Sequence, residues 1–191
     1  SDIGEALTTN IKKSYRMGIE LNAGVNATRW LSIEANAALS QNKIKDFDEV
    51  VEDWENGSQT IHYDNSTLAF SPSTILNGFI VFHHKGIEAI WHTNFVSRMY
   101  LDNTENKDRS LPAYSVSNVT FKYTYKPQRF VKEAVFHLNF SNIFNKRYAA
   151  SGWVYSAIYE SAGHTNDNRY YQIGFMPMAG FTVMGNLTLK F

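Results

Sequence analysis

Apolar and polar residues alternate along most of this 191-residue chain, in stretches of ten or so positions. In the first stretch, every second position is apolar or aromatic: Tyr15, Met17, Ile19, Leu21, Ala23 and Val25. A period of two places these residues on one face of a β-strand and their polar neighbours on the other. Because most of the chain repeats this pattern, we expect an all-β fold.

The pattern predicts about seven strands, at 15–26, 30–41, 68–83, 87–100, 114–125, 133–141 and 181–191. Short connections (27–29, 84–86 and 126–132) alternate with long ones (41–66, 101–113 and 145–180). Up-and-down membrane barrels have this asymmetry, with short periplasmic turns and long external loops. We therefore predict an antiparallel, up-and-down transmembrane β-barrel whose apolar face contacts lipid. Two alternatives stay open: a small passive outer-membrane barrel or adhesin, and a soluble β-sandwich that acts as a binding module.

Seven strands do not close a barrel, because bacterial barrels have an even number of strands and at least eight. Either strands are missing or one more strand lies within 168–176. We favour a fragment, and the start at Ser1-Asp2, with neither Met nor a signal peptide, is expected of a mature product or a fragment.

Composition removes several classes of function. The chain has 18 basic and 18 acidic residues, so charge gives no case for a nucleic-acid partner. It has no cysteine, which excludes disulfides and thiolate chemistry. No apolar run approaches the roughly 20 residues of a transmembrane helix. Aromatic residues make up 15% of the chain, a content that suits strands and the interfacial girdles of barrels.

No catalytic or cofactor-binding motif is evident, so we expect no enzyme, no cofactor and no metal. Serine, histidine and aspartate are present, but nothing in the sequence positions them as a triad. His92 and His137 lie on the polar face without spaced carboxylates, which makes a weak metal site. His83 and His84 lie at a turn.

Two of the expected external loops contain candidate ligand-binding residues. The candidates are Trp54, Trp153, Tyr155, Tyr159, Arg169 and Tyr170. Aromatic rings near an arginine suit a planar or sugar-like ligand. They suit an interfacial girdle, or packing against a partner, equally well. The acidic run from Asp46 to Glu55 suits either a cationic ligand or a solvated loop.

Several segments carry motifs of a known family. They are YRMGIEL at 15–21 with WLSI at 30–33 and NKIKDF at 42–47, YLDNT at 100–104, NIFNKRY at 142–148 and GNLTLKF at 185–191. They resemble, in order, the late barrel strands, a strand-to-loop motif, an N-L-F-D-K-x-Y segment and the C-terminal assembly signal of TonB-dependent outer-membrane receptors. One departure is Asn186, because that signal usually has its glycine one residue nearer the end.

The resemblance implies that residues 1–191 are the C-terminal part of a single 22-stranded barrel domain, with the N-terminal plug and the earlier strands absent. It implies energy-coupled uptake of a siderophore, haem, cobalamin, glycan or peptide across the Gram-negative outer membrane. The implied partners are outer-membrane lipid, the rest of the barrel and plug, the TonB complex through the missing N-terminal region, the barrel-assembly machinery and a surface lipoprotein. Gly185, Leu187, Leu189 and Phe191 would form the assembly signal.

Overall fold

The computed structural model describes residues 11–127, 130–159 and 169–191. The strands within these ranges are β1 (Ser14–Asn26), β2 (Leu31–Asp53), β3 (Gly57–Thr67), β4 (Thr74–His84), β5 (Ile87–Val96), β6 (Met99–Tyr100), β7 (Ser110–Leu111), β8 (Tyr114–Tyr125), β9 (Glu133–Ser141), β10 (Ala149–Ile158), β11 (Arg169–Pro177) and β12 (Thr182–Lys190). A short 3₁₀ helix, η1 (Lys107–Arg109), precedes β7. The predicted all-β fold is confirmed.

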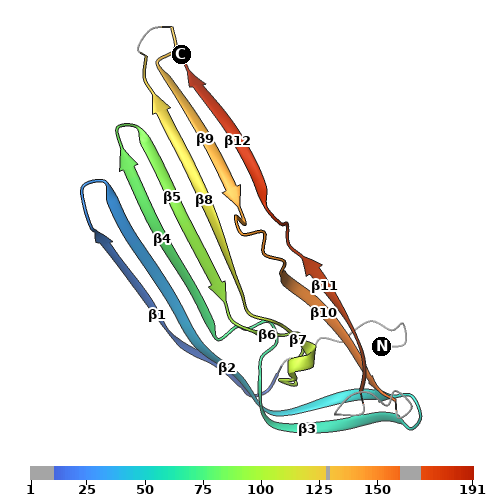
Figure 1. The fold of residues 1–191 in the computed structure, drawn as a ribbon. Helices are drawn as coiled ribbons and strands as arrows, with labels where there is room; N and C mark the ends of the chain where they lie inside the picture. Colours follow the sequence, from blue (N-terminus) through green and yellow to red (C-terminus); the bar gives the residue numbers. More distant parts are fainter. Residues whose placement is uncertain (1–10, 128–129, 160–168) are drawn as a thin grey trace.

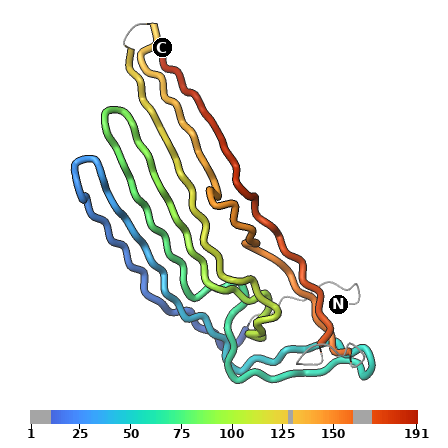
Figure 2. Tube along the Cα trace, viewed as in Figure 1, coloured from blue at the N-terminus to red at the C-terminus, as the bar shows by residue number. Residues whose placement is uncertain are grey.

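Seven long strands lie side by side in chain order: β1, β2, β4, β5, β8, β9 and β12. Each is antiparallel to its neighbours. Figure 1 and Figure 2 show them as one curved sheet, part of the wall of a barrel. β3, β10 and β11 continue beyond this wall and bring the sheet to ten strands. The seven predicted wall strands are therefore all present.

The register aligns apolar residues of neighbouring strands on one face. One row runs through Val25, Ile33, Ile80, Trp91 and Val119. No strand or helix of the described residues covers this face, and Ile19 of β1 is 63% exposed. A large uncovered apolar face fits lipid contact. A soluble sandwich would place a second layer here, so that alternative does not describe this fold.

The other face of the sheet is largely polar. Asn22, Asn36, Asn77 and Asn94 form a row across four strands. Asn77 donates to Asn36 Oδ1 at 2.8 Å and accepts from Asn94 Nδ2 at 2.9 Å. Phe79 lies on the same face, where it stacks on His92 with ring centroids 4.4 Å apart. This face would line the lumen of a closed barrel.

The turns at the two ends of the wall have different geometry. Lys85 and Gly86 have φ values of 45° and 82°, which gives the two-residue hairpin turn expected there. At the other end, Asn142 and Asn145 have φ values of 51° and 49°. The Asn142 amide donates to the carbonyls of Lys146 and Ala179 and so fixes the exit of β9.

Two of the three segments predicted as long loops contain strands. Residues 41–66 hold the second half of β2 and most of β3, and 145–180 hold β10 and β11. These stretches are too polar to show the alternation of apolar and polar residues that marks the wall strands. They still form strands, because pairing supplies hydrogen-bond partners for their backbone N–H and C=O groups. β11 occupies most of 168–176, where the sequence left room for one more strand. Figure 1 shows that β12 continues in the direction of β11, so β11 adds no further strand to the wall. The third segment, 101–113, is a loop with η1 and β7 in it.

The described wall is an open sheet. β1 pairs only with β2, and β12 pairs only with β9, so each has one unpaired edge within the described ranges. None of the helices described is long and apolar enough to cross a membrane.

Candidate functional site

Two hairpins continue past the wall, and we call them together the arch: β3 with the part of β2 that pairs with it, and β10 with β11. β3 pairs with β2 from Lys43 to Asp53. Within this span Asp46 has a φ of 59°, a left-handed conformation that interrupts the regular course of a strand. Figure 1 shows the β2–β3 hairpin crossing the end of the sheet until it meets β10 and β11.

The tips of the two hairpins meet at three aromatic rings, the aromatic clasp. The Trp54 ring lies 5.3 Å from the Tyr159 ring and 5.4 Å from the Tyr170 ring, between centroids. The backbone N–H of Trp54 also donates to the carbonyl of Ile158 at 3.2 Å. Each such ring pair contributes about 0.5–1.5 kcal/mol beyond the area it buries. The clasp therefore holds together two hairpins that leave the wall at different strands.

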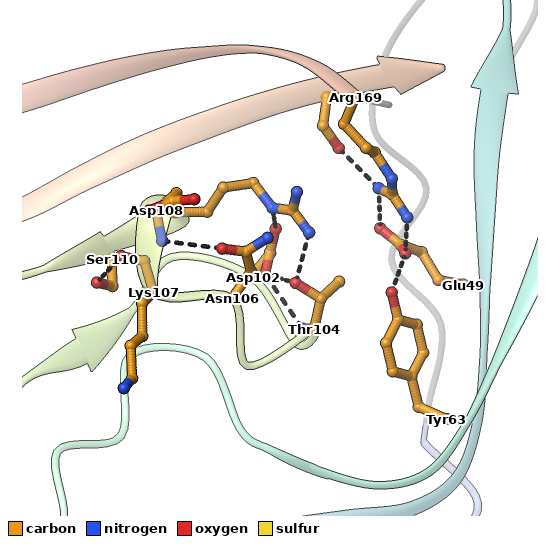
Figure 3. Close-up of polar contacts among 11 residues, drawn as sticks. Glu49, Tyr63, Asp102, Thr104, Asn106, Lys107, Asp108, Ser110 and Arg169 are labelled. Carbon is orange, nitrogen blue, oxygen red and sulfur yellow. Dashed lines mark hydrogen bonds and ion pairs between the residues drawn. The ribbon is translucent and has the colours of Figure 1, made fainter. Parts of the chain in front are cut away.

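A buried ion pair also joins the hairpins. Arg169 donates to both carboxylate oxygens of Glu49, at 3.0 and 2.6 Å, and to the Ser156 hydroxyl at 3.2 Å. The Tyr63 hydroxyl donates to Glu49 from the other side at 3.1 Å (Figure 3). Burial, followed by the charge of Glu49, raises the pKa of Tyr63. The Arg169 side chain is only 2% exposed, so it holds the arch together and is not presented at its surface.

Tyr155 and Trp153 lie on one face of β10, and Tyr170 of β11 lies on the same face of the β10–β11 hairpin. The Tyr155 hydroxyl donates to Glu52 at 2.8 Å, and this bond raises the pKa of Tyr155. Trp153 lies opposite Gly174, where a Cβ would stand 2.0 Å from the indole nitrogen. The glycine therefore makes room for the ring. About half of Trp153, like half of Trp54, is exposed.

The connection between β5 and β8 packs against the arch. Met99, Leu101 and Leu111 form a buried cluster, and Val154 of β10 and Ile173 of β11 pack against it. This cluster gives the arch a small hydrophobic core of the kind found in water-soluble domains.

Arg109 of the same connection is buried and bound on several sides. Its Nε donates to Asp102 at 2.7 Å and its Nη2 to Thr104 at 2.7 Å. The guanidinium also lies 6.0 Å from the centroid of Tyr171 on β11. Figure 3 shows the Asp102 and Thr104 contacts beside the Arg169–Glu49 pair. Arg169 thus joins the two hairpins of the arch to each other, whereas Arg109 joins the β5–β8 connection to β11.

His62 of β3 lies among three carboxylates on the arch. Its Nδ1 is 2.6 Å from Asp48, and its Nε2 is 3.3 Å from Asp64 and 3.7 Å from Asp46. The hydrogen bond to Asp48, followed by the neighbouring charges, raises the pKa of His62. Across residues 11–127, 130–159 and 169–191, no group of three or more His, Asp or Glu residues is arranged to hold a metal ion.

The predicted ligand-binding residues thus fall into three groups. Trp54, Tyr159 and Tyr170 form the clasp. Tyr155 and Trp153 extend its aromatic face, whereas Arg169 is buried behind it. The sequence places Glu49 in an acidic run but does not indicate its pairing, because its partner lies 120 positions away and no local pattern marks such a contact. The roles of Tyr63 and Arg109 were not predicted either.

Three of the residues predicted to form the assembly signal lie on the apolar face of β12. Gly185, Leu187 and Leu189 lie opposite Leu138, Phe136 and Ala134 of β9. Phe191 follows β12, with its ring 5.5 Å from the Phe130 ring, and its carbonyl accepts from Lys132 Nζ at 2.9 Å.

Solved structures share the fold at low sequence identity. One is the siderophore receptor PiuA from Acinetobacter baumannii, with a TM-score of 0.60 and 13% identity over 93% of this chain. The fold is that of a TonB-dependent receptor barrel. The ferric yersiniabactin uptake receptor FyuA from Yersinia pestis gives a TM-score of 0.54 and 14% identity over 92% of this chain. The barrel segment spans only 22% and 23% of those two chains. No family model and no curated protein matches it by sequence.

Proposed function

We propose that this chain is the C-terminal wall of a TonB-dependent transporter that takes up a scarce nutrient across the Gram-negative outer membrane. The observation that carries the proposal is the curved wall with an uncovered apolar face, in the fold of siderophore receptors. In this proposal further strands join the free edges of β1 and β12, and an N-terminal plug fills the lumen and contacts TonB. A closed wall of this kind has no exposed edges.

The proposal assigns a role to each end of the wall. The arch faces the exterior, where the clasp and the neighbouring Tyr155 and Trp153 capture the ligand or contact a surface lipoprotein. The short turns face the periplasm. The C-terminal residues Gly185, Leu187, Leu189 and Phe191 bind the barrel-assembly machinery. Of the nutrient classes, a ferric siderophore has the support of the two similar structures, which are siderophore receptors.

The test uses cells that lack the native gene and carry the full-length protein on a plasmid. Radioactive iron is supplied in spent medium from the iron-starved source organism. We expect iron accumulation to require the gene and to stop when a protonophore collapses the inner-membrane potential. Uptake that is insensitive to the protonophore would favour a passive barrel instead, and an unchanged iron content would argue against a siderophore ligand.

The same cells test the orientation. If the complete protein, like this chain, lacks cysteine, Ser58→Cys in β3 and Arg29→Cys at a short turn each introduce a single thiol. A membrane-impermeant maleimide should label the Ser58→Cys protein on intact cells, and the Arg29→Cys protein only after permeabilisation. Labelling of the Arg29→Cys protein on intact cells would overturn the assigned orientation.

A further inference from the structure

The aromatic clasp shares a face of the arch with a carboxylate. The Tyr155 hydroxyl donates to Glu52 at 2.8 Å, and the Tyr170 ring contacts the Trp54 ring. Because the two tyrosines lie on one face of the β10–β11 hairpin, the carboxylate and the indole lie together beside that face. In the proposed orientation the arch meets water, yet Trp54, Trp153 and Tyr155 are 49%, 50% and 40% exposed. Exposed apolar surface that is grouped in this way marks an interaction site.

The rings of the clasp are tilted against one another. The Tyr159 and Tyr170 rings make angles of 50° and 41° with the Trp54 ring, so none of the three rings is stacked flat on another. The face of an indole is the best aromatic surface for a cation, because its π electrons attract positive charge. Rings alone accept a neutral apolar group as well, so the charge of their surroundings decides between the two kinds of ligand.

The charges beside the clasp are negative. Glu52 is exposed, and in the described part of the chain no lysine, arginine or histidine pairs with its carboxylate. Further along the β2–β3 hairpin, the carboxylates of Asp48 and Asp64 share one basic partner, His62. Arg169 is only 2% exposed and is bound to another carboxylate, so it does not neutralise this face. A positive group would therefore meet an uncompensated carboxylate and exposed ring surface at the same place.

We infer that the clasp and Glu52 together bind a cationic group of the transported ligand, of the substituted-ammonium type. The rings contact the alkyl surface and the charge of the ammonium, and the Glu52 carboxylate supplies the opposite charge. The inference rests on the proposed transport function and names the charge class of the ligand that this site captures. It assigns a role to the acidic run of β2, which the transport proposal leaves without one.

The test measures binding of two small probes to the full-length receptor in an uncharged maltoside detergent. Choline carries a quaternary ammonium group, and dimethylbutanol is the alcohol of the same shape in which a carbon replaces the charged nitrogen. Saturation-transfer NMR gives the affinity of each. We expect choline to bind about tenfold more tightly, from the cation–π contact and the carboxylate together.

Two variants separate these contributions. Glu52→Gln should lower choline affinity about threefold, the size of an exposed ion pair, and should leave the affinity for the alcohol unchanged. Trp54→Leu should narrow the preference for choline over the alcohol by a similar factor, about threefold, because it removes the cation–π contact. Glu52→Gln alters an exposed side chain and keeps all three rings, so it tests the inference even where Trp54→Leu loosens the clasp.

Glu34→Gln is the matched control, because Glu34 is an exposed glutamate on the polar face of the wall, away from the arch. Equal affinities of the two probes, equal losses in Glu52→Gln and Glu34→Gln, or no binding of either probe would overturn the inference. This binding does not depend on energy coupling. Failed iron uptake with Glu52-dependent choline binding would therefore count against the transport proposal alone, and intact uptake without a preference for choline would count against this inference alone.

Discussion

The wall and the arch bury their side chains in opposite ways, and the change takes place within one strand. In the wall half of β2, Leu39 is 44% exposed, whereas in the arch half Ile44 is fully buried and Val51 is 3% exposed; Val50, the neighbour of Val51, stays 71% exposed. Lipid solvates an uncovered apolar side chain, whereas burial of such a side chain is favoured where the solvent is water. In the proposed membrane position, the lipid boundary would therefore lie near residues 40–43 of β2.

The largest expected effect comes from breaking the buried pair of the arch. Glu49→Leu removes the Glu49 carboxylate from beside the buried Arg169 guanidinium, and removal of one partner of such a pair costs about 3–5 kcal/mol. We expect the free energy of opening of the β10–β11 hairpin to fall by this amount. Hydrogen exchange of the β10 amides in the full-length receptor measures that opening.

The double variant sharpens this test. Glu49→Leu combined with Arg169→Leu removes both charges, so we expect it to be less destabilising than Glu49→Leu alone. If the single variant exchanges no faster than the native protein, the ion pair does not hold the arch closed.

The next effect belongs to the wall. Phe121 lies on the apolar face of β8, opposite Leu138, and its neighbour Thr120 lies on the polar face. We expect Phe121→Arg to lower the free energy of unfolding in lipid by about 2–4 kcal/mol, because it places a charge at mid-bilayer depth. Thr120→Arg should lose only one hydrogen bond, about 1 kcal/mol. Urea-induced unfolding in vesicles compares the two, and equal losses would contradict a lipid-facing apolar face.

The smallest effect is a pH dependence of the arch. The folded-state pKa of His62 is raised by Asp48, so its stabilising contribution is fully present below the unfolded-state pKa and is lost as the pH rises through the folded-state pKa. We expect β3 amides to exchange faster above that pKa. NMR titration of the His62 ring should give a lower pKa in Asp48→Asn and a smaller change in Asp64→Asn. An unchanged pKa in Asp48→Asn would exclude the Asp48 contact as the cause.

The wall was predictable from the sequence because each of its strands has one apolar face, toward lipid in the proposed barrel, and one polar face, toward the lumen. The pattern around Ile33 or Leu187 repeats at every second residue, and the Lys85-Gly86 turn marks where the chain reverses. The arch was not predictable in this way. Its strands lie in water on both faces except where another segment covers them, so the apolar positions follow tertiary contacts and not a period of two.

In the candidate site, too, some features were predictable from the sequence and others were not. Aromatic residues at 54, 159 and 170 identify a surface rich in rings, and the structure brings those three together. Arg169 was predicted to face a ligand, but its surroundings depend on Glu49 and Tyr63 from a distant hairpin. Sequence position alone does not show whether an arginine is exposed or buried, because the desolvation is imposed by segments that arrive from elsewhere in the chain.

The clasp and the Arg169–Glu49 ion pair, which join the same two hairpins, have a consequence for the order of folding. Arg169 and Glu49 are separated by 120 residues, and closing so long a loop in a free chain is entropically unfavourable. Once the intervening strands have paired edge to edge, the roots of both hairpins are already fixed and little freedom remains to be lost. The clasp should therefore form last, and its closure would report that every strand between β2 and β12 has paired in the correct register.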